Sequence, residues 1–166
     1  PSMRKVAPYV LTVANSGQAL PAYGLLILFL ILMGQGTNTV IWALVLYALL
    51  PVLRNTMVGL DQVDRSTIEA GRGMGMTKLQ ALTRIELPLA VPVIIAGVRT
   101  ATIINIGMAT LAFLIGGGGL GITINSGLKL QQNEVLIVGA VMVAIVALTF
   151  DWLGALAERY LKPRGL

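Results

Sequence analysis

The sequence predicts an all-α membrane protein in which several helices cross the bilayer as one bundle. The 166 residues are 56% hydrophobic, and their mean hydropathy is +0.84. Only 11% of the residues are charged, whereas a soluble domain carries about 25%. So few charges cannot cover a water-facing surface, which excludes a soluble globular domain. Long apolar stretches separated by short polar segments complete the prediction.

Cysteine and histidine are both absent from the sequence. Their absence excludes disulfides, thiol chemistry, Cys/His zinc sites and histidine acid–base catalysis. We therefore expect no metal centre, no cofactor and no catalytic residues. The net charge is +5. In a membrane protein this excess follows from basic cytoplasmic loops, so we expect no nucleic-acid partner.

Four stretches have the length and composition of a membrane-spanning helix, which needs about 20 apolar residues. The first runs from 8 to 33 and contains Pro21, which removes a helix hydrogen bond and should kink or break the helix. The second, third and fourth stretches cover 39–58, 89–115 and 134–156. We expect these four spans to form a single transmembrane domain.

Positive charges predict the orientation of the spans because Lys and Arg gather in cytoplasmic loops. Basic residues precede the first span, follow the fourth, and cluster between the second and third. The other two loops contain only Lys129. We therefore expect both ends of the chain and the 61–88 loop to face the cytoplasm. The basic residues on this side are Arg4, Lys5, Arg54, Arg65, Arg72, Lys78, Arg84, Arg159, Lys162 and Arg164.

The segment STIEAGRGMGMTKLQALTRIELP, residues 66–88, interrupts the apolar chain with charges and glycines. Ser66 and Glu69 have the S-x-x-E spacing of a helix capping box, and a T-x-x-Q spacing begins at Thr77. Gly75 lies between them, where a helix end favours a left-handed residue. These signals predict a helix, a sharp glycine turn and a second helix on the cytoplasmic surface.

Two interpretations of this segment follow from its residues alone. In the first, it is an amphipathic loop that its basic residues hold on the bilayer surface. In the second, the small residues Ala70, Gly71 and Gly73 allow a second protein to approach closely, and the segment is a docking element. Glu69 serves that docking surface in the second interpretation, or only its own helix cap in the first.

The same segment resembles the EAA motif in permease subunits of ATP-binding-cassette importers. Glu69-Ala70-Gly71 is followed by three residues and Gly75, then by nine residues and the I-x-L-P sequence at 85–88. The family spacing is matched throughout, and Gly71 in place of the second alanine is the one departure. In that family the segment is a coupling helix that docks in a groove of a separate ATPase subunit. The resemblance implies ATPase coupling by Glu69, Ala70, Gly71, Gly75 and Met76.

The resemblance extends over the chain to permeases for quaternary-ammonium osmoprotectants. It is carried by residues 16–29, 44–77 and 98–121. It implies a permease subunit for glycine betaine, choline or carnitine that is not itself an enzyme, because the ATPase is a separate subunit. The implied partners are two ATPase copies, a second permease subunit (identical or paralogous), a substrate-binding protein or domain, and the lipid bilayer. The implied location is the plasma membrane of a bacterium or archaeon.

The MetI-like core of this family has five spans, whereas four are found here. The first span of this chain aligns with the second of the family, which carries a Q-x-x-P feature, here Gln18 and Pro21. We therefore expect residues 1–166 to form a single permease domain that lacks the first core helix and is truncated at its N-terminus. The 61–88 loop would be its cytoplasmic coupling loop.

Arg99 lies about 16 Å beyond Pro88 along the third span, at 1.5 Å per helical residue. A buried arginine costs at least about 2.5 kcal/mol unless it is paired or hydrated. One interpretation gives Arg99 a structural or gating role. The other is that it snorkels or bonds exposed carbonyls of a kinked neighbour. Direct binding of a cationic substrate is not expected, and Asp151 is expected at the cytoplasmic interface.

The polar residues of the spans are further candidates for the translocation pathway. Gln18, Pro21 and Asn105 are assigned with Arg99 to translocation or gating. Alternatively, the polar side chains join helices, at about 0.6 kcal/mol per hydrogen bond. The GGGGLG run at 116–121 lacks the Lys-Ser/Thr of a phosphate-binding loop, so we expect a flexible or close-packed turn on the outer side.

Other function classes remain open from sequence. One is an importer for a different small solute, such as methionine or an oxyanion. Another is an ion-coupled secondary transporter or a channel that works without an ATPase, although no carboxylate is evident at mid-depth for an ion relay. The last is a membrane scaffold that recruits a partner through its loop.

Overall fold

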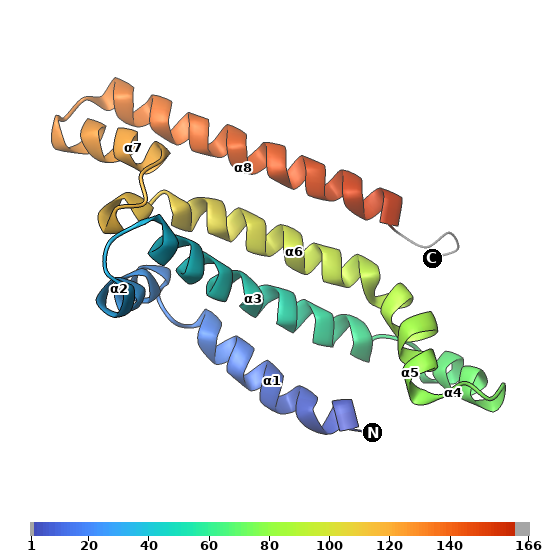
Figure 1. Ribbon diagram of the computed structural model, residues 1–166. Helices are drawn as coiled ribbons and strands as arrows, with labels where there is room; N and C mark the ends of the chain where they lie inside the picture. The colour runs from blue at the N-terminus through green and yellow to red at the C-terminus, as the bar shows by residue number, and fades with distance from the viewer. Residues whose placement is uncertain (1, 162–166) are drawn as a thin grey trace.

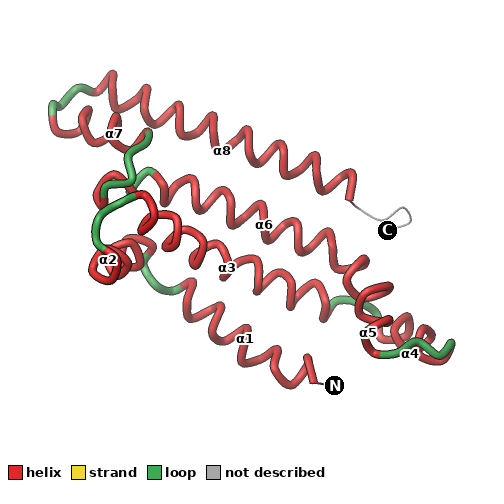
Figure 2. Tube along the Cα trace, viewed as in Figure 1, coloured by secondary structure: helices red, strands yellow, loops and turns green. Residues whose placement is uncertain are grey.

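The computed structural model describes residues 2–161, without the side chains of 2–7 and Gln18. The described residues form helices and loops with no strand (Figure 2), so the predicted all-α class is confirmed. The elements are α1 (Ser2–Gln18), α2 (Ala22–Met33), α3 (Thr37–Asp61), α4 (Arg65–Gly73), α5 (Lys78–Ala81), the π-helical turn η1 (Leu82–Glu86), α6 (Leu87–Ala109), the 3-10 turn η2 (Ala112–Ile115), α7 (Leu120–Lys129) and α8 (Asn133–Leu161).

Four long helices lie side by side in the order α1, α3, α6, α8 (Figure 1). Helices α4 and α5 lie at one end of this bundle, together with the start of α1 and the end of α8. Helices α2 and α7 and the turn η2 lie at the opposite end. This shared placement agrees with the topology predicted from the positive charges, in which both ends of the chain and the 61–88 loop lie on one side of the membrane.

Three helical runs are long and apolar enough to cross a membrane: α3, the continuous run Lys78–Ala109, and α8. A fourth candidate consists of Pro8–Gly17 and α2, which meet at 88° as a broken span or a re-entrant loop. Pro21 lies between them as the N-cap of α2, with φ −59°. Proline therefore breaks the first predicted span, as expected from its missing amide hydrogen.

Small residues bring α3 and α6 into close contact. A Cβ atom on Gly97 would lie 2.6 Å from the Asn55 Cβ, and one on Gly59 would lie 3.0 Å from the Val93 Cβ. Ala90, also on this interface, is fully buried. Membrane helices associate largely through such packing, because lipid removes the hydrophobic drive that acts in water. The α3–α6 pair is the close-packed centre of the bundle.

The main apolar cluster lies at the end opposite α4 and α5. It joins α2, α3, α6 and η2 through Leu25, Leu26, Val40, Ala43, Met108, Ala112 and Ile115. The glycine-rich run covers this end. A Cβ on Gly117 would lie 2.6 Å from the Val40 Cγ2, and a Cβ on Gly121 would collide with the Thr110 carbonyl oxygen. Of the two turns expected here, the close-packed one is found.

Helix α7 forms within residues 116–133, between the third and fourth predicted spans, where the sequence alone predicts only a connection. Its ten residues span about 15 Å, too short to cross a bilayer. The helix packs against α8, and the absence of a side chain at Gly127 allows this approach, since a Cβ there would lie 2.8 Å from the Leu136 nitrogen. The fold therefore has an additional short helix at this end.

The close α3–α6 contact leads to a stability prediction. Gly97→Leu should lower the melting temperature of the purified permease, because overpacking a tight interface costs about 1–3 kcal/mol. Gly107→Leu is the matched control on the same helix, since no atom lies within 4 Å of its Cβ position. Thermal unfolding followed by size-exclusion chromatography compares the two variants. Equal melting temperatures would contradict the packing account.

Candidate functional site

Asp64 caps helix α4. Its carboxylate accepts hydrogen bonds from the Ser66 amide at 3.0 Å and from the Ser66 hydroxyl at 2.8 Å, and these bonds hold the pKa of Asp64 below its ordinary value. The predicted capping box of Ser66 and Glu69 is therefore wrong: aspartate caps as well as serine does, and α4 already begins at Arg65, so that Ser66 lies inside the helix. Glu69 takes no part in the cap and is exposed.

Gly75 turns the chain after α4 with a φ of +88°. The Met76 amide donates to the Gly71 carbonyl at 3.2 Å, and the Gly75 amide donates to the Arg72 carbonyl at 2.9 Å. This pair of bonds is a Schellman motif, which requires a left-handed residue at the position of Gly75. The predicted glycine turn is confirmed.

The second predicted capping box, at Thr77 and Gln80, is also confirmed. The Gln80 amide donates to the Thr77 hydroxyl oxygen at 3.3 Å, and the Thr77 amide donates to the Gln80 side-chain oxygen at 2.8 Å. Helix α5 then runs without a break through η1 into α6. The Leu87 amide bonds the Leu82 carbonyl five residues back, so a π-helical turn carries the helix past Pro88. The turn is thus attached directly to a membrane-spanning helix.

Gly71 lies at the inner side of the turn. It is buried, and a Cβ there would collide with the Ile85 Cδ1 and lie 3.3 Å from the Met76 sulfur. Glycine at this position lets Ile85 pack directly against α4. The first and last parts of the motif are therefore in contact, and the departure from E-A-A has a local structural reason.

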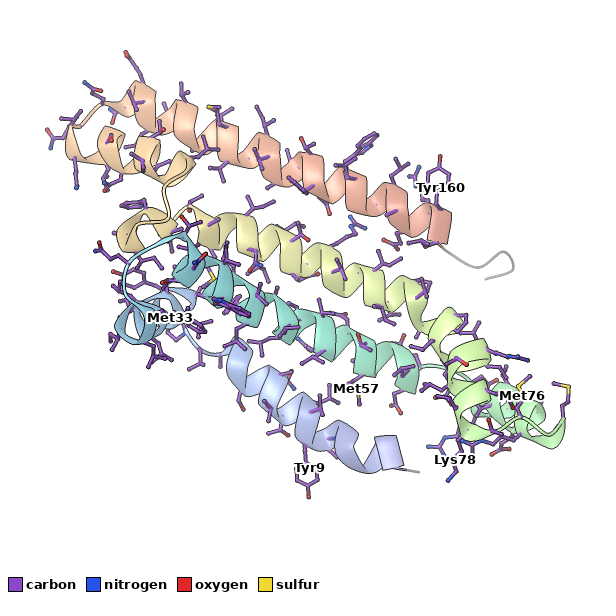
Figure 3. The ribbon with its side chains drawn as sticks, viewed as in Figure 1. Tyr9, Met33, Met57, Met76, Lys78 and Tyr160 are labelled. Atoms are coloured by element: carbon purple, nitrogen blue, oxygen red, sulfur yellow. The ribbon has the colours of Figure 1, made fainter. Side chains whose placement is uncertain are left out.

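The outer surface of the turn carries exposed small, acidic and apolar residues. Glu69, Ala70 and Gly75 are exposed, and Met76 is half-buried and lies with Lys78 at this end of the molecule (Figure 3). Two large apolar side chains are also uncovered here: Met74 is 75% exposed and Leu79 is 69% exposed. Neither residue was among those predicted from the motif, although apolar residues in the most polar segment were an available signal.

Arg99 on α6 binds two carboxylates of α8. Its Nε and Nη2 donate to the Asp151 Oδ1 at 3.1 and 2.7 Å, and its Nη1 donates to the Glu158 Oε2 at 2.8 Å. The interpretation that Arg99 bonds exposed backbone carbonyls is therefore wrong, and its structural or gating role stays a prediction. Helix α8 extends beyond the predicted end of the fourth span, and Asp151 lies about 15 Å before its last residue, Leu161.

Asn105 joins α6 to α3 because its Nδ2 donates to the Leu44 carbonyl at 3.1 Å. Its Oδ1 is buried and has no hydrogen-bond partner among residues 2–161. The residue also borders an open groove of about 300 Å³ between α6 and α8. Asn105 therefore joins two helices, as one of the two interpretations predicts. Its role in the translocation pathway stays a prediction. The groove is lined by Thr102, Asn105, Ile106, Ala109 and Phe150.

The remaining two candidates lie at the break of the first span. Gln18 is the last residue of α1, and its side chain lies outside the described residues. Pro21 is exposed at the start of α2. Neither belongs to the 61–88 loop, called the 61–88 turn below, or to the cluster of Arg99, Asp151 and Glu158. Within the described part of the chain, no group of three acidic, His or Cys residues could hold a metal ion.

Residues 2–164 match the family model described as "Binding-protein-dependent transport system inner membrane component". The chain belongs to this permease family. It is therefore a multi-pass component of an ATP-binding-cassette importer in the inner membrane, and the ATPase is a separate subunit in such systems. Membership excludes the channel, secondary-transporter and scaffold alternatives.

Curated relatives of the permease resemble it over nearly its whole length. The choline transport system permease protein OpuBB of Bacillus subtilis (strain 168) is 48% identical over 164 residues, which are 99% of this chain and 76% of the relative. The osmoprotectant import permease protein OsmY of Salmonella typhimurium (strain LT2) is 45% identical over 163 residues, which are 98% of this chain and 69% of the relative.

A solved structure, the MetNI methionine ABC transporter in inward-facing conformations, superimposes on the permease with a TM-score of 0.82. The alignment covers 98% of this chain and 78% of the other, at 22% sequence identity. At that identity the likeness concerns the fold, and it confirms the predicted MetI-like helical bundle.

The contact between Gly71 and Ile85 makes a prediction about the turn itself. Gly71→Leu should raise the rate of tryptic cleavage at Arg72 in the purified permease, because the added side chain displaces Ile85 and loosens the turn. Ile85→Ala in the same chain should restore much of the protection by making room. Additive effects of the two substitutions, without this compensation, would show that the contact does not hold the turn.

Proposed function

We propose that this permease forms half of the pathway of an importer for quaternary-ammonium osmoprotectants, such as glycine betaine, choline and carnitine. The observation that supports the substrate class best is the agreement among curated relatives with closely related functions. Besides the choline permease, the Bacillus subtilis permease protein OpuCB is 46% identical over 164 residues and is named for glycine betaine, carnitine and choline transport. Carnitine permeases of Listeria monocytogenes are 41% to 43% identical.

The charges inside the bundle are compatible with a substrate that carries a quaternary ammonium group. Arg99 is the only basic residue of α6. Its guanidinium forms ion pairs with Asp151 at 2.7 Å and with Glu158 at 2.8 Å. One positive and two negative charges present no net repulsion to a quaternary ammonium group. The two carboxylates thus offset the positive charge of Arg99.

The 61–88 turn supplies the coupling surface for the ATPase in this proposal. Its exposed face offers the carboxylate of Glu69 and the small residue Ala70, flanked by the apolar side chains of Met74 and Leu79. Uncovered apolar side chains beside a polar rim are typical of protein interfaces. Gly71 and Gly75 set the shape of the turn, and the half-buried Met76 lies against Gly71. We place this turn and both chain ends in the cytoplasm.

The assembly proposed around the permease has two permease subunits, identical or paralogous, two ATPase subunits on the cytoplasmic side and a substrate-binding component on the other. ATP binding brings the ATPases together and moves the docked turns. Each turn then displaces α6, since the helix is continuous from Lys78 to Ala109. ATP drives transport only because the two permease conformations fit the two ATPase states unequally.

Substrate choice is tested with the complete transporter, reconstituted in liposomes with its ATPase and binding component. We expect ATP-dependent uptake of radiolabelled glycine betaine, choline or carnitine, and competition among them. Methionine and sulfate serve as comparison solutes of different chemistry. Uptake of either of these, with none of the three ammonium compounds, would contradict the proposed substrate class and keep the importer class.

The coupling role of the turn is tested at Gly75. Gly75→Val should remove most co-purifying ATPase while membrane insertion stays normal, because a β-branched residue is strained at a φ of +88°. Gly75→Asn is the matched control, since asparagine adopts the left-handed region more readily, and it should retain more of the ATPase. Normal co-purification with Gly75→Val would contradict the role of the turn.

A further inference from the structure

The contact of Arg99 with α8 is built by both helices. Asp151, Gly154 and Glu158 are three and four residues apart and so lie on one face of α8. A Cβ on Gly154 would lie 2.5 Å from the Arg99 Cγ and 3.1 Å from its Cδ. Glycine at 154 therefore leaves a notch for the stem of the arginine. The guanidinium then reaches one carboxylate on each side of the notch.

The two helices joined by this contact are attached differently to the rest of the molecule. Helix α6 continues the 61–88 turn as one helical run. Helix α8 follows α7 at the opposite end of the bundle (Figure 1), and it packs against α6 and α7. Only 6% of its apolar stretch is buried inside the bundle. Its lateral connection to the turn therefore runs through α6.

We propose that Arg99, Asp151 and Glu158 form a clamp that makes α8 move with α6 as one body during transport. A charge-assisted contact of three hydrogen bonds fixes both distance and orientation, which apolar side chains in lipid do less well. The clamp passes the displacement of the turn on to the last helix. The three residues are positioning residues: they do not contact the substrate.

The clamp rests on the proposed coupling of the turn to the ATPase, and the two can fail separately. If the coupling proposal is wrong, ATPase binding does not depend on the turn, and Gly75→Val still binds the ATPase. The clamp concerns the step after docking, so its readout is the amount of substrate transported per ATP hydrolysed. That ratio does not depend on how much complex assembles. If the three residues had only a structural role, their substitution would lower the amount of assembled complex and leave the ratio unchanged.

The first experiment uses the reconstituted transporter with Arg99→Lys and Arg99→Gln. Lysine keeps the charge but lacks the planar fork that reaches both carboxylates. We expect each variant to bind the ATPase and hydrolyse ATP, and the transport-to-hydrolysis ratio to fall by roughly two- to thirty-fold, more for Gln than for Lys. Arg159→Gln is the control, because it removes an exposed positive charge next to Glu158 and should leave the ratio unchanged. An unchanged ratio in Arg99→Lys and Arg99→Gln overturns the clamp.

A second experiment replaces the clamp by a covalent bond and does not depend on the folding of Arg99→Gln. The chain has no cysteine, so Arg99→Cys with Gly154→Cys introduces a single pair at a close contact of α6 with α8, where a Cβ on Gly154 would lie 2.5 Å from the Arg99 Cγ. We expect the oxidised pair to transport with a ratio near that of the unmodified permease, and reduction to lower the ratio. The transporter with the unmodified permease, exposed to the same oxidant and reductant, controls for cysteines of the other subunits.

The opposite behaviour of the cysteine pair would overturn the proposal. If oxidation stops transport and reduction restores it, then α6 and α8 must separate in each cycle, and the Arg99 contact is a gate that opens. If oxidation and reduction leave the ratio equally high, the contact has no part in coupling.

Discussion

The uninterrupted helix from Lys78 to Ala109 is the constraint on which the other features of the permease depend. It joins the polar turn to the centre of the bundle in one helical run, because the π-helical turn at 82–86 carries the helix past Pro88 without a break. Close packing at Gly59 and Gly97 then couples this piece to α3, and Arg99 couples it to α8. In the proposed mechanism, a displacement at the turn reaches both neighbouring helices through these contacts.

The low dielectric of the bilayer explains where the polar groups lie. An isolated charge there is expensive, and Arg99 is satisfied by two carboxylates of a neighbouring helix. Asn105 bonds a backbone carbonyl of α3 through its amide nitrogen. At the 61–88 turn the opposite situation holds: the apolar side chains of Met74 and Leu79 are uncovered in the most polar part of the chain. The turn and the Arg99 contact are the two elements to which we assign the proposed coupling.

Local signals allowed most of the turn to be predicted, whereas contacts between distant residues could not be. The left-handed Gly75 and the Thr77 capping box depend on neighbouring residues and were predicted correctly. The first cap was assigned to Ser66, because two good caps stand two residues apart and spacing does not rank them. Helix α7 was missed because it is short and begins in a glycine run. The Arg99–Asp151 pair joins residues 52 positions apart, and no single-sequence pattern connects them.

The central claim is that the 61–88 turn binds the ATPase subunit. Its most direct test is site-specific photo-crosslinking in native membranes. A photoreactive amino acid is introduced at Met74 in the turn and, as a control of equal exposure, at Ile31 in α2 at the opposite end, the two being 75% and 74% exposed. We expect a crosslink to the ATPase subunit from position 74 and none from position 31. Crosslinks from position 74 to lipid alone would contradict the claim and support a loop that lies on the bilayer surface.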